Sequence, residues 1–513
     1  MINKTNYLLL IITTLAIAFA FQGSRGLFET TEGRYAEASR EMLQTNDWLT
    51  PQLDYKPHWT KPPMIYWCIA LSIKFLGVNT WGARICNSLF FCATIFLIFN
   101  LSKTISGREA AYLSWMISAT APFMIIGLQS LTIDMLLTFW ELLIVLSYWK
   151  CMRVEDGRSK KIWLTVLWLS SGAAFLTKGP PGLLSLLCII LFNYLQKLRK
   201  RPFMQLFWTP AIVLFLLSGF LWYVIVIYKN PGLLHYYVSN EIAGRILTNQ
   251  HHRNSLWIAP LYIYIIPLLT GLGPWVFLWF GKLKKDSIKS LGILKNHILS
   301  SNEILFLIIW CFFPLLILSL VKSRLVLYML PFFPAFIMLT SLVTVQSQPK
   351  SIIRYKQVFI FSAIFILILK GSLAFIPSSK NMYQLYRSIT DLKSNISKKY
   401  SVISTHSDFL YGLQFYLNGN FVRENYKNLF LRIEQSECSP LSKSGTLPIL
   451  IIDNFEGDSL MHFLQKTKIS FLYRAVGRKY SIYLIKPSCS AQKTSKSFVP
   501  SLSKASALRR ANR

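Results

Sequence analysis

Charged and aromatic residues crowd the stretch 29–67, which follows one apolar segment and precedes a long series of others. It reads ETTEGRYAEASREMLQTNDWLTPQLDYKPHWTKPPMIYW. So many charges and prolines cannot lie in hydrocarbon. Carboxylates in such a stretch could orient or deprotonate a nucleophile, and its cations could stabilise a departing phosphate. We therefore take the stretch as the candidate centre of the chemistry.

Glu32 is the first candidate catalytic carboxylate, with the anion-binding candidates Arg34 and Tyr35 close behind it. Thr31 could cap a helix that starts at Glu32, and the helix dipole favours a carboxylate in the first turn. Apolar residues recur at i, i+3 and i+7 from Tyr35, which predicts a helix lying on the membrane surface. An ordinary capped amphipathic helix explains this pattern equally well.

Lys61 is the next candidate, in the sequence TKPP. The two prolines end helices and fix the backbone, so they hold Lys61 at the entrance to the segment 64–77. That segment is short for a membrane span and carries Lys74, which predicts an interfacial or re-entrant helix. A lysine here suits a phosphate, although interfacial lysines that snorkel are common.

Four later candidates interrupt or flank apolar segments. Asp134 lies in LTIDMLLTFW, where an acid costs about 2.5–3.5 kcal/mol at mid-helix and less near the interface. That cost favours a functional or ion-paired carboxylate. Lys178 lies in LTKGPPGL, where a short loop also needs a polar residue. Arg245 lies in the polar loop 229–257, and Tyr328 lies about one helical turn after two cations in KSRLVLYMLPFFP, where anion binding competes with snorkelling.

The composition indicates a polytopic membrane protein. The chain has 513 residues, is 53% hydrophobic and has a mean hydropathy of +0.40. Its net charge of +33 is scattered in short clusters between apolar runs. This distribution fits the positive-inside rule and anionic lipids, not a nucleic-acid binder. Cysteine and histidine spacing predicts no metal site, a divalent-cation requirement stays open, and Cys438 and Cys489 could form a disulfide outside the cytosol.

We predict a mainly α fold, a polytopic membrane helical bundle of about 11–13 spans. Each span needs roughly 20 apolar residues. With the N-terminus in the cytosol, the strongest basic clusters all fall on one side, and every candidate site residue falls on the other. The predicted spans lie near 6–22, 83–102, 110–128, 131–149, 162–177, 182–196, 206–228, 257–281, 303–320, 325–346 and 356–372.

The chain becomes soluble-like after residue 372. Strand patterns at 401–405, 447–453, 469–475 and 480–485, with helical patterns at 410–417 and 457–465, predict a small α/β domain on the outer side. The predicted organisation is a transmembrane catalytic domain over 1–372 with an outer loop at 23–80, a soluble domain over 373–487, and a disordered basic tail over 488–513.

Several of these motifs resemble those of a known family. The stretch GLFETTEGRYAEASREMLQTNDWLTPQLDYKPHWTKPPMIYW resembles the first periplasmic loop of the bacterial aminoarabinose transferases that modify lipid A. These belong with the protein O-mannosyltransferases in the GT-C superfamily. The resemblance extends through SLTIDMLLTFW, FLTKGPPGLL, YYVSNEIAGRI, HHRNSLW, GPWVF and KSRLVLYMLPFFP, and so covers the chain to about Pro334.

The resemblance implies transfer of a sugar from undecaprenyl phosphate, with inversion, on the periplasmic face of the inner membrane. It implies that Arg34, Lys61 and Arg245 face the lipid phosphate and that Asp134 supplies a carboxylate. It also implies that Tyr35 and Tyr328 line the same cavity, with Lys178 in a further family motif.

The sequence departs from the family at two positions. Thr31 precedes Glu32 where the family usually has an Asp before the Glu, and His58 stands where a Tyr is frequent. The missing Asp is the residue most often assigned as the catalytic carboxylate. Either Glu32 takes over, or the acceptor needs no strong base. An ionised phosphate acceptor fits the second reading, because it needs little deprotonation.

The leading functional hypothesis is therefore a membrane glycosyltransferase that moves a sugar, such as 4-amino-4-deoxy-L-arabinose, onto lipid A or a related glycolipid. A second hypothesis keeps the reaction and changes the acceptor to a protein hydroxyl or another polysaccharide. A third is a transporter or flippase of lipid-linked sugars, which would carry charge or broken helices at the membrane midplane. The expected partners are the undecaprenyl-phosphate sugar, the acceptor and membrane lipids, without nucleic acid.

Overall fold

The structure is a computed structural model that forms two compact units, residues 1–386 with 409–419, and residues 387–408 with 420–513. It describes residues 4–29, 31–248, 254–277, 301–347, 352–376, 378–394, 400–405, 409–424, 447–453, 460–462, 464–465, 471–476 and 480–485.

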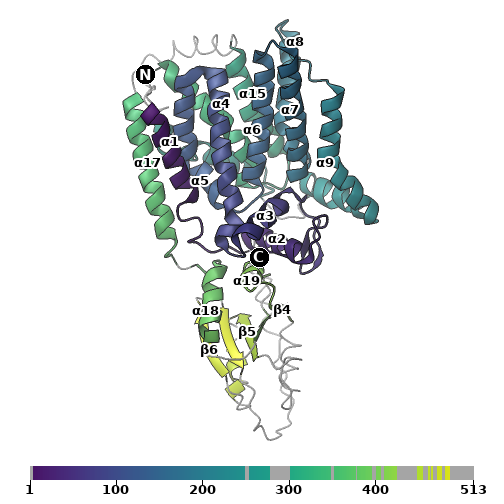
Figure 1. Ribbon diagram of the computed structural model, residues 1–513, viewed down its shortest axis with the longest axis vertical. Coiled ribbons are helices and arrows are strands. Elements are labelled where there is room, and N and C mark those ends of the chain that lie inside the picture. The colour runs from purple at the N-terminus through teal and green to yellow at the C-terminus, as the bar shows by residue number, and fades with distance from the viewer. Residues whose placement is uncertain are drawn as a thin grey trace. The chain divides into compact units, whose positions relative to one another are not determined.

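The first unit is a bundle of apolar helices (Figure 1). Seven stretches of the described chain are helical, long and apolar enough to cross a membrane. They are Thr80–Thr120, Asp134–Arg153, Pro180–Leu198, Thr209–Lys229, Asn302–Leu320, Val326–Gln346 and Tyr355–Leu373. The predicted multi-pass helical fold is therefore confirmed.

The longer helices of this unit are α1 (Lys4–Phe19), α2 (Thr31–Thr45), α3 (Met64–Leu76), α4 (Thr80–Thr120), α5 (Pro122–Gln129), α6 (Asp134–Arg153), α7 (Gly157–Lys178), α8 (Leu184–Leu198), α9 (Thr209–Lys229), α15 (Asn302–Leu320), α16 (Phe333–Ser347) and α17 (Ile352–Leu373). The shorter ones are η1 (Pro180–Leu183), α10 (Leu233–Tyr236), the π-helix η2 (Tyr237–Ala243), α11 (Gly244–Ile246), the π-helix η3 (Leu261–Ile265), α12 (Ile266–Thr270), η4 (Gly273–Val276) and η5 (Val326–Phe332). Helix α18 (Met382–Ser394) follows the bundle.

The sequence predicts more spans than the seven found in the described chain, because of a bent helix and of apolar helices that are shorter than a span. The predicted spans 83–102 and 110–128 both begin within α4, which is bent at Gly107. Gly107 has a φ of +86°, a conformation that glycine adopts without the steric cost of a side chain. The predicted spans near 6–22 and 257–281 correspond to shorter apolar helices within the described residues.

Helices α2 and α3 lie at the end of the bundle away from the N-terminus of α1 (Figure 1). Helix α3 has the bounds expected of the predicted interfacial helix. The expectation that α2 lies on the membrane surface is wrong, because Glu32, Glu37, Arg40 and Glu41 are as buried as its apolar residues. Helix α2 packs against α3 on one side and α19 (Tyr411–Tyr416) on another.

A small hairpin joins α2 to α3. Strands β1 (Gln52–Leu53) and β2 (Lys56–Pro57) pair antiparallel, and the turn between them has a φ of +56° at Asp54 and +57° at Tyr55. Non-glycine residues rarely adopt this conformation unless their surroundings hold them there. The buried carboxylate of Glu41 does so by accepting hydrogen bonds from the Asp54 amide at 2.9 Å and the Tyr55 amide at 2.8 Å.

The second unit contains a five-stranded mixed sheet, which includes the four predicted strands and a fifth, residues 421–423, that the sequence analysis did not predict. The strands follow the order β4-β3-β5-β7-β6, with β3 parallel to β4 and β5, and β7 antiparallel to β5 and β6. Of the predicted helix 457–465, residues 460–462 and 464–465 are described and are helical, whereas the basic tail falls outside the described residues. The strands are β3 (Tyr400–Ser404), β4 (Phe421–Arg423), β5 (Leu447–Asp453), β6 (Phe471–Val476) and β7 (Tyr480–Ile485).

Helix α19 joins the first unit, although the sequence assigns its residues to the soluble domain. The Tyr416 hydroxyl accepts a hydrogen bond from the Leu27 amide at 2.9 Å and lies 2.7 Å from the Thr80 hydroxyl. The Gly412 amide donates to Glu29 at 2.8 Å. A late segment of the chain thus covers an early one.

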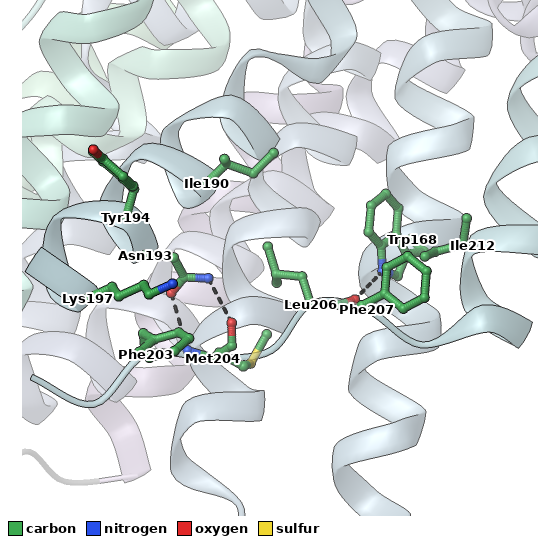
Figure 2. Close-up of a pocket in the computed structure, with 10 residues that line it drawn as sticks. All are labelled: Trp168, Ile190, Asn193, Tyr194, Lys197, Phe203, Met204, Leu206, Phe207 and Ile212. Atoms are coloured by element: carbon green, nitrogen blue, oxygen red, sulfur yellow. Dashed lines mark hydrogen bonds between the residues drawn. The ribbon is translucent and has the colours of Figure 1, made fainter.

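A shallow apolar groove opens on the surface between α7, α8 and the start of α9. Figure 2 shows its lining, in which the Asn193 side chain bonds the Met204 backbone and the Trp168 indole bonds the Leu206 carbonyl. None of the candidate site residues lines this groove, so it is separate from the candidate centre of chemistry.

The contact between α2 and α19 yields a stability prediction. A Cβ at Gly33 would lie 2.3 Å from the Gly412 amide nitrogen, so Gly33→Ala forces two backbones apart. We expect a loss of about 1–3 kcal/mol, measured by denaturant unfolding of the detergent-solubilised protein. Gly157→Ala is the matched control, since a Cβ there meets no atom within 4 Å and should not destabilise. Equal stability of the two variants would contradict the close approach.

Candidate functional site

The Asp134–Lys178 ion pair is the buried centre of the site. Asp134 begins α6 and Lys178 ends α7, so the adjoining ends of two helices bring their side chains together. The Lys178 Nζ lies 2.6 Å from the Asp134 Oδ1, and both side chains are less than a tenth exposed. The same Nζ lies 4.2 Å from the centre of the Tyr328 ring. Three residues that are distant in sequence thus form one contact group.

Tyr35 extends this group toward α2 and α3. Its ring is buried and lies 5.8 Å from the Tyr66 ring of α3, centre to centre. Burial raises the pKa of the Tyr35 hydroxyl, and the Tyr66 hydroxyl and the charge of Asp134 add to this rise. The hydroxyl therefore stays protonated and can serve as a hydrogen-bond donor, but not as a base.

A second group gathers cations around Glu241. The Arg245 guanidinium on α11 bonds the Glu241 carboxylate at 2.8 and 3.0 Å, and the Lys61 ammonium lies 3.9 Å from it. Glu241 lies in the π-helix η2, an irregular geometry that is frequent at functional sites. The half-buried Arg34, whose guanidinium lies 5.9 Å from the Tyr35 ring centre, has no carboxylate partner among the described residues. Two cations therefore share the Glu241 carboxylate, and a third, Arg34, acts with Lys61 on the neighbouring His58.

His58 remains neutral beside these cations. Burial lowers the pKa of its imidazole, and the charges of Arg34 and Lys61 lower it further, to about 4. Its Nε2 lies 2.7 Å from the Thr60 hydroxyl. At neutral pH the ring can donate or accept a hydrogen bond but adds no charge.

Glu32 lies in a different group from the other candidates. Its carboxylate accepts from the Arg25 guanidinium at 2.9 and 3.1 Å and from the Arg84 guanidinium at 2.7 Å. It also accepts from the backbone amides of Phe28 at 2.8 Å and Leu131 at 3.1 Å. Both oxygens are therefore engaged within the protein.

This environment keeps Glu32 ionised. Burial would raise the pKa of its carboxyl, but Arg84 and Arg25 outweigh burial and lower the pKa to about 2. A carboxylate held so firmly is a weak base at neutral pH. The geometry thus gives no support to the catalytic role suggested for Glu32 by the sequence, whereas it brings Asp134, Lys178, Tyr328 and Tyr35 together.

Sequence reasoning missed four residues of these groups, namely Arg25, Arg84, Tyr66 and Tyr236. Arg84 carried a usable signal, because an arginine in the first turns of a long apolar helix needs a partner. Tyr66 carried none, since an aromatic residue in an apolar helix is ordinary. The pair Cys438 and Cys489 and the motif residues 249–253 fall outside the described residues, and the rest contains no cluster of metal-ligand side chains.

Comparisons with known proteins bear on the family and the fold. The family model for dolichyl-phosphate-mannose-protein mannosyltransferase matches residues 60–223. An undecaprenyl phosphate-alpha-4-amino-4-deoxy-L-arabinose arabinosyl transferase from Pectobacterium carotovorum is 28% identical over 336 residues, 65% of this chain and 58% of that protein. Seven transferases of this name are matched over 54–58% of their length, so this chain spans less than two thirds of those relatives.

Two solved structures share the fold. The crystal structure of ArnT from Cupriavidus metallidurans bound to undecaprenyl phosphate has a TM-score of 0.69 at 18% identity, and covers 96% of this chain and 100% of that one. An oligosaccharyltransferase from Archaeoglobus fulgidus has a TM-score of 0.51 at 12% identity, covering 95% of this chain and 75% of that one.

The chain therefore has the fold of a GT-C membrane glycosyltransferase. Within that class, the resemblance to the aminoarabinose transferases and protein mannosyltransferases that the sequence indicates is confirmed.

The ion pair yields a prediction about stability. Asp134→Asn leaves the buried Lys178 ammonium unpaired and should cost about 3 kcal/mol, because a lone buried charge is strongly unfavourable. The double variant Asp134→Asn with Lys178→Met should recover most of that loss. Denaturant unfolding of the four proteins in detergent measures the coupling.

The matched control breaks the exposed ion pair between Arg153 and Glu303, whose side chains are 51% and 31% exposed. Glu303→Gln should cost less than about 1 kcal/mol. An additive double variant at Asp134 and Lys178 would show that the two charges are not coupled.

Glu32 yields a prediction about pH. Because the folded-state pKa is about 2 and the ordinary value is 4.5, the ionised carboxylate stabilises the fold by about 3 kcal/mol above pH 4.5. That contribution declines as pH falls from 4.5 toward 2. The stability difference between the wild type and Glu32→Gln should therefore be constant from pH 7 to 5 and shrink below pH 4.5. A difference that grew on acidification would refute the lowered pKa.

Proposed function

We propose that this chain transfers a sugar from undecaprenyl phosphate to a phosphate group of lipid A or a related glycolipid. The observation that carries the proposal is a group of three cations: Lys61 and Arg245 share the carboxylate of Glu241, and Arg34 and Lys61 both act on His58. An excess of positive charge at a half-buried surface suits a phosphate. The likeness to a transferase structure bound to undecaprenyl phosphate supports the lipid carrier.

The same cations suit the chemistry of the transfer. An acceptor oxygen attacks the anomeric carbon of the sugar, and the bond from that carbon to the phosphate oxygen breaks, which leaves undecaprenyl phosphate. Negative charge grows on the phosphate as the bond breaks, so fixed cations stabilise the transition state more than the ground state. The protonated Tyr35 hydroxyl is a further donor beside Arg34.

The carboxylates around the site favour an acceptor that needs no deprotonation. Asp134 is paired with Lys178, Glu32 with two arginines, and Glu241 with Arg245. Each carboxylate is engaged by at least one cation, and for Glu32 the two arginines lower the pKa, which weakens it as a base. A phosphate is already ionised at neutral pH, whereas a hydroxyl would lose its proton in the reaction.

The exposed Thr31 supports the same choice of acceptor, because the related transferases usually carry a carboxylate there. A protein hydroxyl or another polysaccharide is the second candidate acceptor, for which Asp134 would have to act as the base. The aminoarabinose donor remains part of the proposal, supported by the names of the similar transferases.

We further propose that the site faces the periplasm from the inner membrane. The basic clusters of the sequence support this orientation through the positive-inside rule, which assigns them to the cytosol.

The test is the mass of glycolipids extracted from cells with and without the gene. We expect the gene to add the mass of one sugar residue to lipid A or a related glycolipid, and tandem fragmentation to locate that sugar on a phosphate. An unchanged glycolipid profile would exclude this acceptor. A sugar found on proteins or polysaccharide instead would favour the second candidate, and transport of labelled lipid-linked sugar across vesicles without any product would favour a transporter.

The phosphate site itself is tested by binding of undecaprenyl phosphate to the purified protein. Arg34→Gln should weaken binding at least about tenfold, a loss of about 1.4 kcal/mol. The matched control is Lys56→Met, which removes an exposed cation from the hairpin and should change binding less than about twofold. Equal affinities for both variants would remove Arg34 from the phosphate site.

A further inference from the structure

A short link, residues 130–133, connects α5 to α6 and determines where Asp134 lies. Asp134 is the first residue of α6, so its side chain moves with the end of this link. Side chains from α4, from α2 and from the segment before α2 anchor the link and the last turn of α5. These anchors lie outside the group that contains Asp134 and Lys178.

The anchors form hydrogen bonds with backbone atoms of the link and of the last turn of α5. The Glu32 carboxylate accepts from the Leu131 amide at 3.1 Å, and the Arg25 guanidinium donates to the Gln129 carbonyl at 2.9 Å. The Asn87 amide donates to the carbonyls of Leu128 at 2.7 Å and Ser130 at 3.1 Å. Every position from 128 to 131 is thereby hydrogen-bonded to a side chain from another element.

Glu32 is the member of this group that joins the others. Arg25 and Arg84 both bind its carboxylate, and Arg84 also donates to the Gly26 carbonyl at 3.0 Å. Arg84 is fully buried, and Glu32 is 6% exposed. Charged hydrogen bonds in such a setting are strong and directional, so they define one geometry for the link.

We propose that Glu32 is a positioning residue for Asp134. By holding the Leu131 amide, and through Arg25 the Gln129 carbonyl, Glu32 fixes the start of α6 so that Asp134 stays within 2.6 Å of Lys178. The consequence for catalysis rests on the proposed function, while the anchoring of the link does not.

The size of the expected effect follows from geometry. The charge of Asp134 acts on Tyr35, the donor proposed for the phosphate, so a shift of about 1 Å in this arrangement can lower the rate by roughly 100-fold. Glu32→Gln keeps the shape of the side chain but replaces one carboxylate oxygen with an NH2 group. This group cannot accept a hydrogen bond from an arginine, as both oxygens of Glu32 do. The link should loosen, and Asp134 should leave its contact with Lys178 more often, while the cations near Glu241 remain in place.

The experiment compares three variants in full-length protein. Glu32→Gln and the milder Arg25→Lys weaken the anchor, and Arg25→Lys keeps the test available if Glu32→Gln does not fold. Glu37→Gln is the matched control, because Glu37 is a fully buried carboxylate on the same helix, paired with Arg40 at 2.7 Å, and has no contact with the link. It should lower stability without changing the link.

Three measurements separate positioning from general stability. Hydrogen–deuterium exchange over residues 127–134 reports the link, binding of undecaprenyl phosphate reports the cation group, and the initial rate of glycolipid formation in membranes reports the reaction. For Glu32→Gln we expect exchange at least tenfold faster, binding within about threefold of wild type, and a rate 10- to 100-fold lower. Glu37→Gln should keep all three within about threefold, and Arg25→Lys should lie between.

The results decide whether Glu32 positions Asp134, only stabilises the fold, or does neither. Unchanged exchange in both anchor variants overturns the proposal, and so does faster exchange with a normal rate. A Glu37→Gln variant that reproduces the loss of rate at equal stability would reduce Glu32 to a general stabilising residue. If wild-type membranes form no product, the proposed function fails and positioning for transfer fails with it, while the exchange data still decide whether Glu32 anchors the link.

Discussion

The cost of burying charge governs the region where the site is built. Helix α2 carries several charged residues and is nevertheless covered on most of its surface. A buried carboxylate without donors would cost several kcal/mol, so each one must bring another part of the chain to it. Glu32 recruits two arginines and two backbone amides, Glu37 recruits Arg40, and Glu41 recruits the hairpin turn.

These carboxylates hold α2, the hairpin after it and the link before α6 in one arrangement at the end of the apolar bundle. Glu32 binds the link before α6, Glu37 binds Arg40 within α2, and Glu41 binds the turn that leads to Lys61. The residues of the site can therefore come from five separate stretches of the chain and still meet. The cations near Glu241 are less enclosed than the Asp134–Lys178 pair, which suits a ligand arriving from the membrane or from water.

The sequence predicted much of this arrangement because apolar runs, prolines and isolated charges carry strong local signals. The bounds of α3, four strands of the C-terminal sheet and the placing of Asp134, Lys178 and Tyr328 on one side of the bundle followed from such signals or from the family resemblance. The burial of α2 did not, because the helix that covers it comes more than 360 residues later. Nor did the role of Glu32, since its partners Arg25 and Arg84 become neighbours only through tertiary packing.

The contact between Gly33 and Gly412 also bears on how the chain is made. Helix α2 leaves the ribosome early, whereas α19 follows only after the whole bundle has been synthesised. At roughly 5–20 residues per second, the interval is on the order of 20 to 75 s. During that time the bundle is inserted but the charged face of α2 lacks its cover. The cover that α19 places on α2 is therefore among the last contacts of the first unit to form.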